Sequence, residues 1–223
     1  MRATGRGAGV RLREGRKAMR HSRIPAAGLL VRPEELPAAR AGRDFFLRDT
    51  RVVARELLGA WLVRHRGGAT YAVRLVEVEA YLGVEDRAAH SWGGRRTARV
   101  EPMYGPGGLL YVFQIYGMYF CANVVTRERD VPQAVLLRAA EHPRLAPGVL
   151  SGPGRLCRAF GITKGLSGLD LVDSAEFEVR PAPVPRRRIA VSPRIGVDYA
   201  GPAKDWPLRY CLAGAPAVTS PRR

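Results

Sequence analysis

The sequence predicts an α+β fold, a single domain in which a mainly antiparallel β-sheet is flanked by short helices. Three observations lead to this prediction. Short runs of β-branched and aromatic residues alternate with glycine-containing turns, as they do in β-hairpins. Helical periodicity occurs only over short segments, and no internal repeat is visible. The length of 223 residues suits one domain and is sufficient for a hydrophobic core.

The first 40 residues differ from the rest of the chain. They hold ten lysines and arginines against three glutamates, and they show no sustained hydrophobic period. We expect residues 1–40 to be a basic tail without fixed structure, followed by one domain over residues 41–223 that becomes ordered near Asp44. The tail is either a dispensable extension, with Met19 as an alternative start, or a basic arm that raises non-specific affinity for DNA.

Two short helices are expected in the domain. In residues 49–59, Asp49 or Thr50 can cap the first turn, apolar residues recur at helical spacing, and Gly59 ends the helix. The second helix follows a Gly-Pro-Gly turn and ends at Gly161.

Strands are expected where β-branched, aromatic and leucine residues dominate short runs. These runs are residues 60–66 and 70–80, two strands within 109–125 that are joined by a bend at Gly117, and residues 133–140 and 209–212. A Gly-Gly turn joins the first two strands, and residues 182–188 form a loop rich in proline and arginine. Alternation along residues 70–80 places Glu77 and Glu79 on the same face of the sheet.

The chain is strongly basic, with 37 Lys and Arg against 20 Asp and Glu, a formal net charge of +17 and a pI near 11.0. This charge favours an acidic polymer as partner, nucleic acid before an anionic membrane surface. No run approaches the roughly 20 apolar residues of a membrane span, and the N-terminus lacks the apolar core of a secretion signal. We therefore expect no membrane association and a cytoplasmic location, on the nucleoid if the source is bacterial.

The inventory of reactive residues narrows the chemistry. Three scattered cysteines and four scattered histidines argue against a disulfide framework and a zinc site. Phosphate-binding glycine loops and nucleophile elbows are missing from the sequence, so we expect neither a metal nor a cofactor. No lysine lies between Glu77 and Arg138 to act as a nucleophile. Water activated by a carboxylate is the chemistry that remains.

Glu79 is the candidate for that carboxylate, because it ends a strand beside a loop. Spacing alone favours a surface glutamate paired with an arginine, and Glu77 is better explained as such a partner. His90 is either a buried histidine with a satisfied ring or a pocket residue that hydrogen-bonds a substrate base or ribose-phosphate. The arginine- and glycine-rich residues 93–99 either approach phosphates or form a solvated loop.

Aromatic residues are concentrated between residues 104 and 120. Most such sets belong to a core. Tyr116, however, lies at the expected bend beside Gly117, and an aromatic side chain at a hairpin tip of a basic protein can insert into a base stack. Other aromatic side chains of the set can sandwich a base.

Several motifs in register resemble the alkyladenine (3-methyladenine) DNA glycosylase family. They are residues 76–83, 85–86, 88–91, 111–123, 135–139, 152–157 and 194–197. The resemblance extends from about residue 44 to residue 218. It implies a curved antiparallel sheet with a protruding hairpin that inserts into DNA, and a monofunctional glycosylase of base excision repair. Such an enzyme flips an alkylated or deaminated purine out of duplex DNA and hydrolyses the N-glycosidic bond, leaving an abasic site.

The resemblance also implies roles for the residues that act on the sugar and the duplex. Glu79 would be the general base for the water that attacks C1′. Arg138 and the main chain near Val197 would help to hold that water. Tyr116 would fill the gap that the flipped nucleotide leaves.

The base pocket that the resemblance implies would be formed by Tyr81, His90 and Phe113. Asn123 would shape this pocket against the amino group of guanine. Phe113 departs from the tyrosine expected in many relatives, so stacking is kept while a hydroxyl hydrogen bond is lost. The expected partner is double-stranded DNA that contains damaged purines, bound by a monomer. Two other functions remain as alternatives: a nucleic-acid-binding module without catalysis, and a hydrolase for a small acidic substrate.

Overall fold

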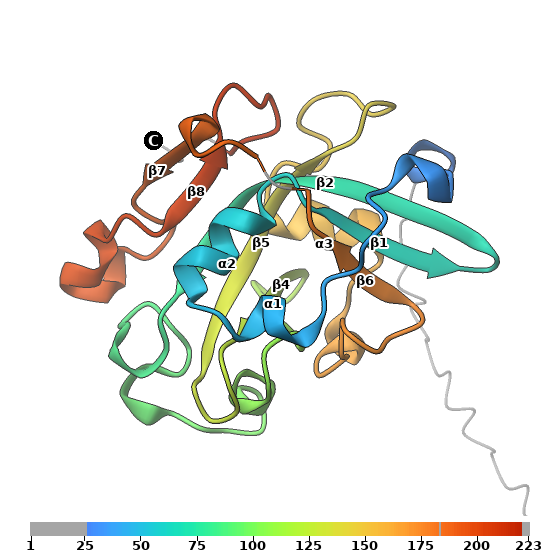
Figure 1. Cartoon of the computed structure of the whole chain (residues 1–223). Helices are drawn as coiled ribbons and strands as arrows, with labels where there is room; N and C mark the ends of the chain where they lie inside the picture. The colour runs from blue at the N-terminus through green and yellow to red at the C-terminus, as the bar shows by residue number, and fades with distance from the viewer. Residues whose placement is uncertain (1–25, 183, 220–223) are drawn as a thin grey trace, which may run out of the picture.

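The computed structural model describes residues 26–182 and 184–219 (Figure 1). Its centre is a mainly antiparallel sheet in the order β3-β4-β5-β2-β1-β6, to which β8 and β7 are added along the edge of β2. The strands are β1 (Trp61–Arg66), β2 (Ala69–Tyr81), β3 (Leu110–Ile115), β4 (Tyr119–Thr126), β5 (Gln133–Glu141), β6 (Phe177–Arg180), β7 (Ile189–Ser192) and β8 (Arg209–Leu212). The predicted α+β class is therefore confirmed.

Short helices accompany this sheet. The α-helices are α1 (Arg43–Leu47), α2 (Thr50–Leu57) and α3 (Pro153–Phe160). The 3-10 helices described are Ala26–Leu29, Pro33–Glu35, Gly83–Glu85, Trp92–Gly94, Glu101–Tyr104, Lys164–Leu166, Arg186–Arg188 and Asp198–Asp205. In Figure 1, α2 crosses in front of the sheet, with β7 and β8 at one end and the β1–β2 hairpin at the other.

The two predicted helices form for the expected reasons. The Asp49 side chain caps α2 by accepting a hydrogen bond of 2.9 Å from the Arg51 amide. Val53 and Leu57 of this helix are fully buried in the main core. Gly161 ends α3 with a φ of 63°, in the left-handed region that glycine adopts without strain.

Ordered structure begins earlier than the expected Asp44. Leu29 is fully buried in the main core, and the Val31 amide donates a hydrogen bond of 3.0 Å to the Thr70 carbonyl. Arg40 donates to the Leu171 carbonyl at 2.7 Å. Residues 26–40 therefore pack against the sheet although their composition is that of a flexible tail. The first 25 residues of the predicted tail lie outside the described residues.

Three elements were not predicted from the sequence: α1, β6 and β7. Each has only four or five residues, so its periodic pattern is weak. Part of the loop expected over residues 182–188 forms the 3-10 helix Arg186–Arg188. Within the described ranges, no helix is long and apolar enough to cross a bilayer.

Candidate active site

The register of the sheet aligns residues from five strands in one row. Arg209 of β8 pairs with Glu79 of β2, Glu79 with Leu136 of β5, Leu136 with Asn123 of β4, and Asn123 with Tyr111 of β3. Directly paired residues point to the same face of a sheet. Side chains from distant parts of the chain are therefore gathered on one surface.

Glu77, Glu79 and Arg138 form a buried charged group on this surface. Both glutamates are fully buried, and Arg138 is 8% exposed. The register between β2 and β5 shifts on both sides of Glu77, which marks a β-bulge. Bulges redirect side chains locally, and here both carboxylates reach the same guanidinium group.

Glu79 is held by three groups from different elements. Its Oε1 atom accepts a hydrogen bond of 2.8 Å from the Ile195 amide and lies 3.3 Å from Nη1 of Arg138. Its Oε2 atom accepts a hydrogen bond of 2.9 Å from the Tyr81 hydroxyl. Burial raises the pKa of Glu79, and the charge of Arg138 opposes that rise. The result is a positioned carboxylate with an increased affinity for a proton.

Glu77 has more donors than Glu79. Arg138 Nε and Arg209 Nε each donate to Oε1 at 2.8 Å. The Thr219 hydroxyl donates to Oε1 and the Thr219 amide to Oε2, both at 2.6 Å. Burial alone would raise the pKa of Glu77, but hydrogen bonds from Thr219 and Arg209, with the charge of Arg138, bring the pKa below its ordinary value.

A second cluster contains His90, Phe113 and Asn123, joined by Tyr111. Nδ1 of His90 lies 2.8 Å from the Tyr111 hydroxyl, and the His90 and Phe113 rings meet edge to face with centroids 4.4 Å apart. Nδ2 of Asn123 donates to the Tyr111 carbonyl at 3.1 Å. Burial, together with the charges of nearby arginines, lowers the pKa of His90 to about 4, so its ring is neutral at neutral pH.

Tyr116 lies apart from both clusters at the tip of the β3–β4 hairpin. It is 86% exposed, and the hairpin prediction is confirmed by the Met118 amide, which donates to the Ile115 carbonyl at 3.2 Å. The φ values of Tyr116 and Gly117 are 49° and 68°, as required in the tight turn that suits hairpins. A non-glycine residue in this region costs about 1–3 kcal/mol of backbone strain.

Comparisons with known proteins identify the family of this chain. A family model described as Methylpurine-DNA glycosylase (MPG) matches residues 44–216. The chain belongs to the methylpurine-DNA glycosylase family. A relative from Desulfitobacterium hafniense is 46% identical over 201 residues, covering 81% of this chain and 98% of its own. It is provisionally named a 3-methyladenine DNA glycosylase.

Two further relatives carry the same provisional name. One from an Anaeromyxobacter species is 47% identical over 173 residues, covering 77% of this chain and 88% of its own. Another, from Clostridium perfringens, is 39% identical over 195 residues, covering 78% and 95%. The protein is thus a DNA glycosylase, a hydrolase of N-glycosyl bonds that acts in base excision repair.

In this glycosylase the main-chain contact to Glu79 comes from Ile195, two residues before the predicted Val197. Val197 itself is buried in a small cluster with Tyr81 and Ala88. The loop that carries both residues is fixed by Arg194, whose Nη2 atom donates to Asp86 Oδ1 at 2.9 Å. Tyr81 is fixed by the same arginine, whose guanidinium carbon lies 4.7 Å from the centre of the ring.

Two residues of the candidate site, Arg209 and Thr219, were not predicted from the sequence. Tyr111 and Ile195 were covered only as a member of the aromatic set and as main chain near Val197, without their contacts to His90 and Glu79. The register of β3 and β4 could have identified Tyr111, because it is paired with Asn123. For Thr219 there is no local signal, since its contact to Glu77 joins residues 142 positions apart.

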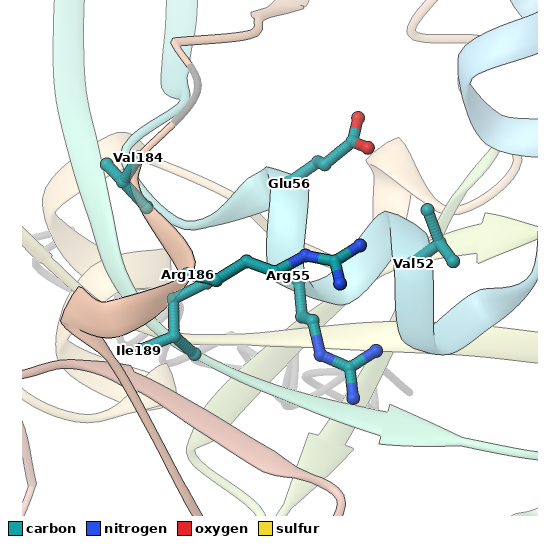
Figure 2. A pocket seen from close by; sticks show the side chains of 6 residues that line it. All are labelled: Val52, Arg55, Glu56, Val184, Arg186 and Ile189. Atoms are coloured by element: carbon teal, nitrogen blue, oxygen red, sulfur yellow. The ribbon is translucent and has the colours of Figure 1, made fainter.

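A separate cavity of about 270 Å³ lies beside α2 (Figure 2). The side chain of Arg186 extends toward α2, where Arg55 lies. The cavity is lined by Val52, Arg55, Glu56, Val184, Arg186 and Ile189. None of the site residues predicted from the sequence lines this cavity, so it is distinct from the two clusters.

Proposed function

We propose that this glycosylase flips an alkylated or deaminated purine out of duplex DNA and that Glu79 activates the water that attacks C1′ of its sugar. The observation that carries the proposal is the buried Glu79 carboxylate, held by Ile195, Tyr81 and Arg138. A carboxylate offers about four lone-pair positions, and these three groups face three of them. One position on Oε2 is left for a proton of a water molecule.

In the proposed reaction, water replaces the purine on C1′ and Glu79 takes up the proton of that water. The water oxygen forms a bond to C1′, the bond from C1′ to the purine nitrogen breaks, and its electron pair leaves with the purine. The water proton passes to Glu79. A general base is most efficient when its pKa lies near the working pH, and burial moves Glu79 in that direction. A cationic alkylated purine leaves as a neutral base and therefore needs no acid.

Arg138 and the aromatic residues have different proposed tasks. The charge of Arg138 favours the ionised form of Glu79, and its guanidinium group helps to orient the water. Tyr81, His90 and Phe113 enclose the flipped base, and Asn123 excludes normal guanine. Phe113 stacks but donates no hydrogen bond.

Binding of the duplex depends on Tyr116 and on the basic surface. Inserting the exposed Tyr116 ring restores stacking and so offsets part of the few kcal/mol that extrusion costs. The net positive charge supplies salt-dependent phosphate contacts. A monomer suffices for these steps, and the proposed location is the cytoplasm, on the nucleoid in a bacterium.

The proposal is tested with the variant Glu79→Gln in a single-turnover excision assay. The duplexes carry methylated purines, 1,N6-ethenoadenine or hypoxanthine, with uracil as the control, and alkali reveals abasic sites. Excision should be lost, while binding to lesion DNA is kept because the side chain retains its shape. Excision by Glu79→Gln at the wild-type rate would remove Glu79 from the mechanism.

A further inference from the structure

Glu77 is a fully buried carboxylate that the proposed reaction does not use. It nevertheless has four hydrogen bonds, more than Glu79, and two of them come from a single residue of the C-terminal segment, Thr219. Burying a charge is costly unless it is paired and hydrogen-bonded. We therefore ask what the buried, fully hydrogen-bonded Glu77 carboxylate does beside Glu79.

The three nitrogens of the Arg138 guanidinium group are divided between Glu77, Glu79 and Thr219. Arg138 directs Nε to Glu77 at 2.8 Å and Nη1 toward Glu79 at 3.3 Å. Its remaining nitrogen, Nη2, donates to the Thr219 hydroxyl at 3.3 Å, and that hydroxyl in turn donates to Glu77 at 2.6 Å. Each nitrogen of the guanidinium group thus has its own partner, and only Nη1 faces Glu79.

Arg209 balances the charge of this group. Two carboxylates face two arginines, and Arg209 directs its Nε atom to Glu77 rather than to Glu79. It also donates from Nη2 to the Thr219 carbonyl at 2.5 Å and from Nη1 to the Ser192 hydroxyl at 3.2 Å. Without Arg209 and Thr219, Glu77 would compete with Glu79 for the whole Arg138 guanidinium group, because bidentate pairing is the stronger arrangement.

We propose that Glu77, Arg209 and Thr219 are positioning residues that hold Arg138 in the orientation that presents Nη1 to Glu79. Thr219, near the C-terminus, thereby becomes part of the active site through its contacts with Glu77 and Arg138. This inference rests on the proposed role of Glu79 as the general base.

The other groups around Glu79 do not offer an alternative anchor for Arg138. Arg194 is occupied by a buried pair with Asp86, and Tyr81 donates to Glu79 itself. Cys121 of β4 and Cys211 of β8 are buried thiols whose pKa values burial raises to about 11, so both are uncharged. Among these groups, only Glu77 and Thr219 accept from Arg138 outside its contact with Glu79.

The test compares Thr219→Val, which lacks the hydroxyl, with Thr219→Ser, which keeps it. A matched control is Thr70→Val, which removes a hydroxyl 3.1 Å from His65 at the start of β2. Single-turnover excision is measured across pH on a duplex with a cationic methylated purine, with spontaneous depurination subtracted. The affinity for the same lesion DNA and the melting temperature are measured for every variant.

Thr219→Val removes both hydrogen bonds of the hydroxyl, to Glu77 and from Arg138, and should excise roughly tenfold more slowly because Arg138 is then held less firmly toward Glu79. Because Glu77 then draws more strongly on Arg138, the acid limb of its pH–rate profile should move to higher pH. Thr219→Ser should restore both, and lesion affinity should stay unchanged. Glu77→Gln removes an anion next to Glu79, so its acid limb should move in the opposite direction, to lower pH.

A wild-type rate and pH profile for Thr219→Val would overturn the inference, and so would a loss that Thr219→Ser does not restore. If Glu77→Gln fails to fold, the rates and pH profiles of the two Thr219 variants still test the inference. Failure of the proposed function is recognised separately, because only in that case does Glu79→Gln excise the base.

Discussion

Replacing Asp86 by asparagine should unfold the loop that supports Glu79. The side chains of Asp86 and Arg194 are fully buried. Nη1 and Nη2 of Arg194 donate hydrogen bonds to the two Asp86 oxygens, at 2.5 and 2.9 Å. The Leu82 and Ala88 amides donate to the same oxygens at 3.0 Å. Asparagine would leave the Arg194 charge unpaired and turn an NH₂ group toward one of these donors.

The expected cost of Asp86→Asn is about 3–5 kcal/mol, the range for breaking a buried ion pair by removing one partner. For a domain of this size that corresponds to a fall of roughly 6–20 °C in melting temperature. Excision should fall as well, because the Ile195 amide that contacts Glu79 follows Arg194 directly. Urea unfolding, followed by circular dichroism, measures the free energy.

A matched control is Glu101→Gln, which breaks a pair with Arg96 that is also bidentate, at 3.0 and 2.7 Å, but exposed. Its free energy of unfolding should stay unchanged, because solvent screens the pair. A loss below about 1 kcal/mol for Asp86→Asn would refute the view that this buried pair holds the loop.

Three further predictions concern the hairpin, the pocket and the tail. Tyr116→Gly should stabilise the fold by up to about 1 kcal/mol, because glycine relieves the strain of the positive φ but loses more conformational entropy on folding. It should also weaken lesion binding; thermal unfolding and a titration with lesion duplex measure the two effects. The pKa of His90 is lowered to about 4 from an ordinary value of 6.5, so the folded protein favours the neutral ring. The stability that neutral His90 contributes is present above pH 6.5 and is lost as the pH falls toward 4. His90→Gln should flatten this part of the curve of unfolding free energy against pH. Deleting residues 1–25 should leave excision intact and reduce the salt dependence of DNA binding, whereas deleting residues 1–40 should also lower the melting temperature because Leu29 is lost from the core.

The elements that the sequence predicted are those with a local cause. The Asp49 cap, the glycine that ends α3 and the hairpin turn at Tyr116 and Gly117 each act within a few residues. The packing of residues 26–40 had no such cause, since Leu29 is buried by a sheet formed from later parts of the chain. Composition described this segment as a tail, and tertiary contacts outweighed composition.

In the candidate site, too, local features were predictable from the sequence and long-range contacts were not. The motif around Glu79, His90 and Asn123 was visible in the sequence, but the partner of each residue was not. Ile195 and Tyr111 come to these residues through the sheet register and the Arg194 loop, and Thr219 comes from the far end of the chain. Pairing across a sheet depends on strand order, which a pattern of residue types does not specify.

Glu77 and Glu79 illustrate how one strand can give two identical side chains opposite properties. Both are fully buried, both contact Arg138, and they lie two residues apart on β2. Burial moves both pKa values upward, but at Glu77 the hydrogen bonds from Thr219 and Arg209 outweigh that rise, whereas at Glu79 burial prevails. Glu77 has four hydrogen bonds, two of them from arginines, and stays ionised. Glu79 has one amide, one hydroxyl and a longer contact to a guanidinium group that is already engaged, so its affinity for a proton rises. Two carboxylates displaced in opposite directions are the pattern expected where one group carries charge and its neighbour moves a proton. The low pKa of Glu77 therefore depends on Arg209 of strand β8 and on Thr219, whose hydrogen bonds Glu79 lacks.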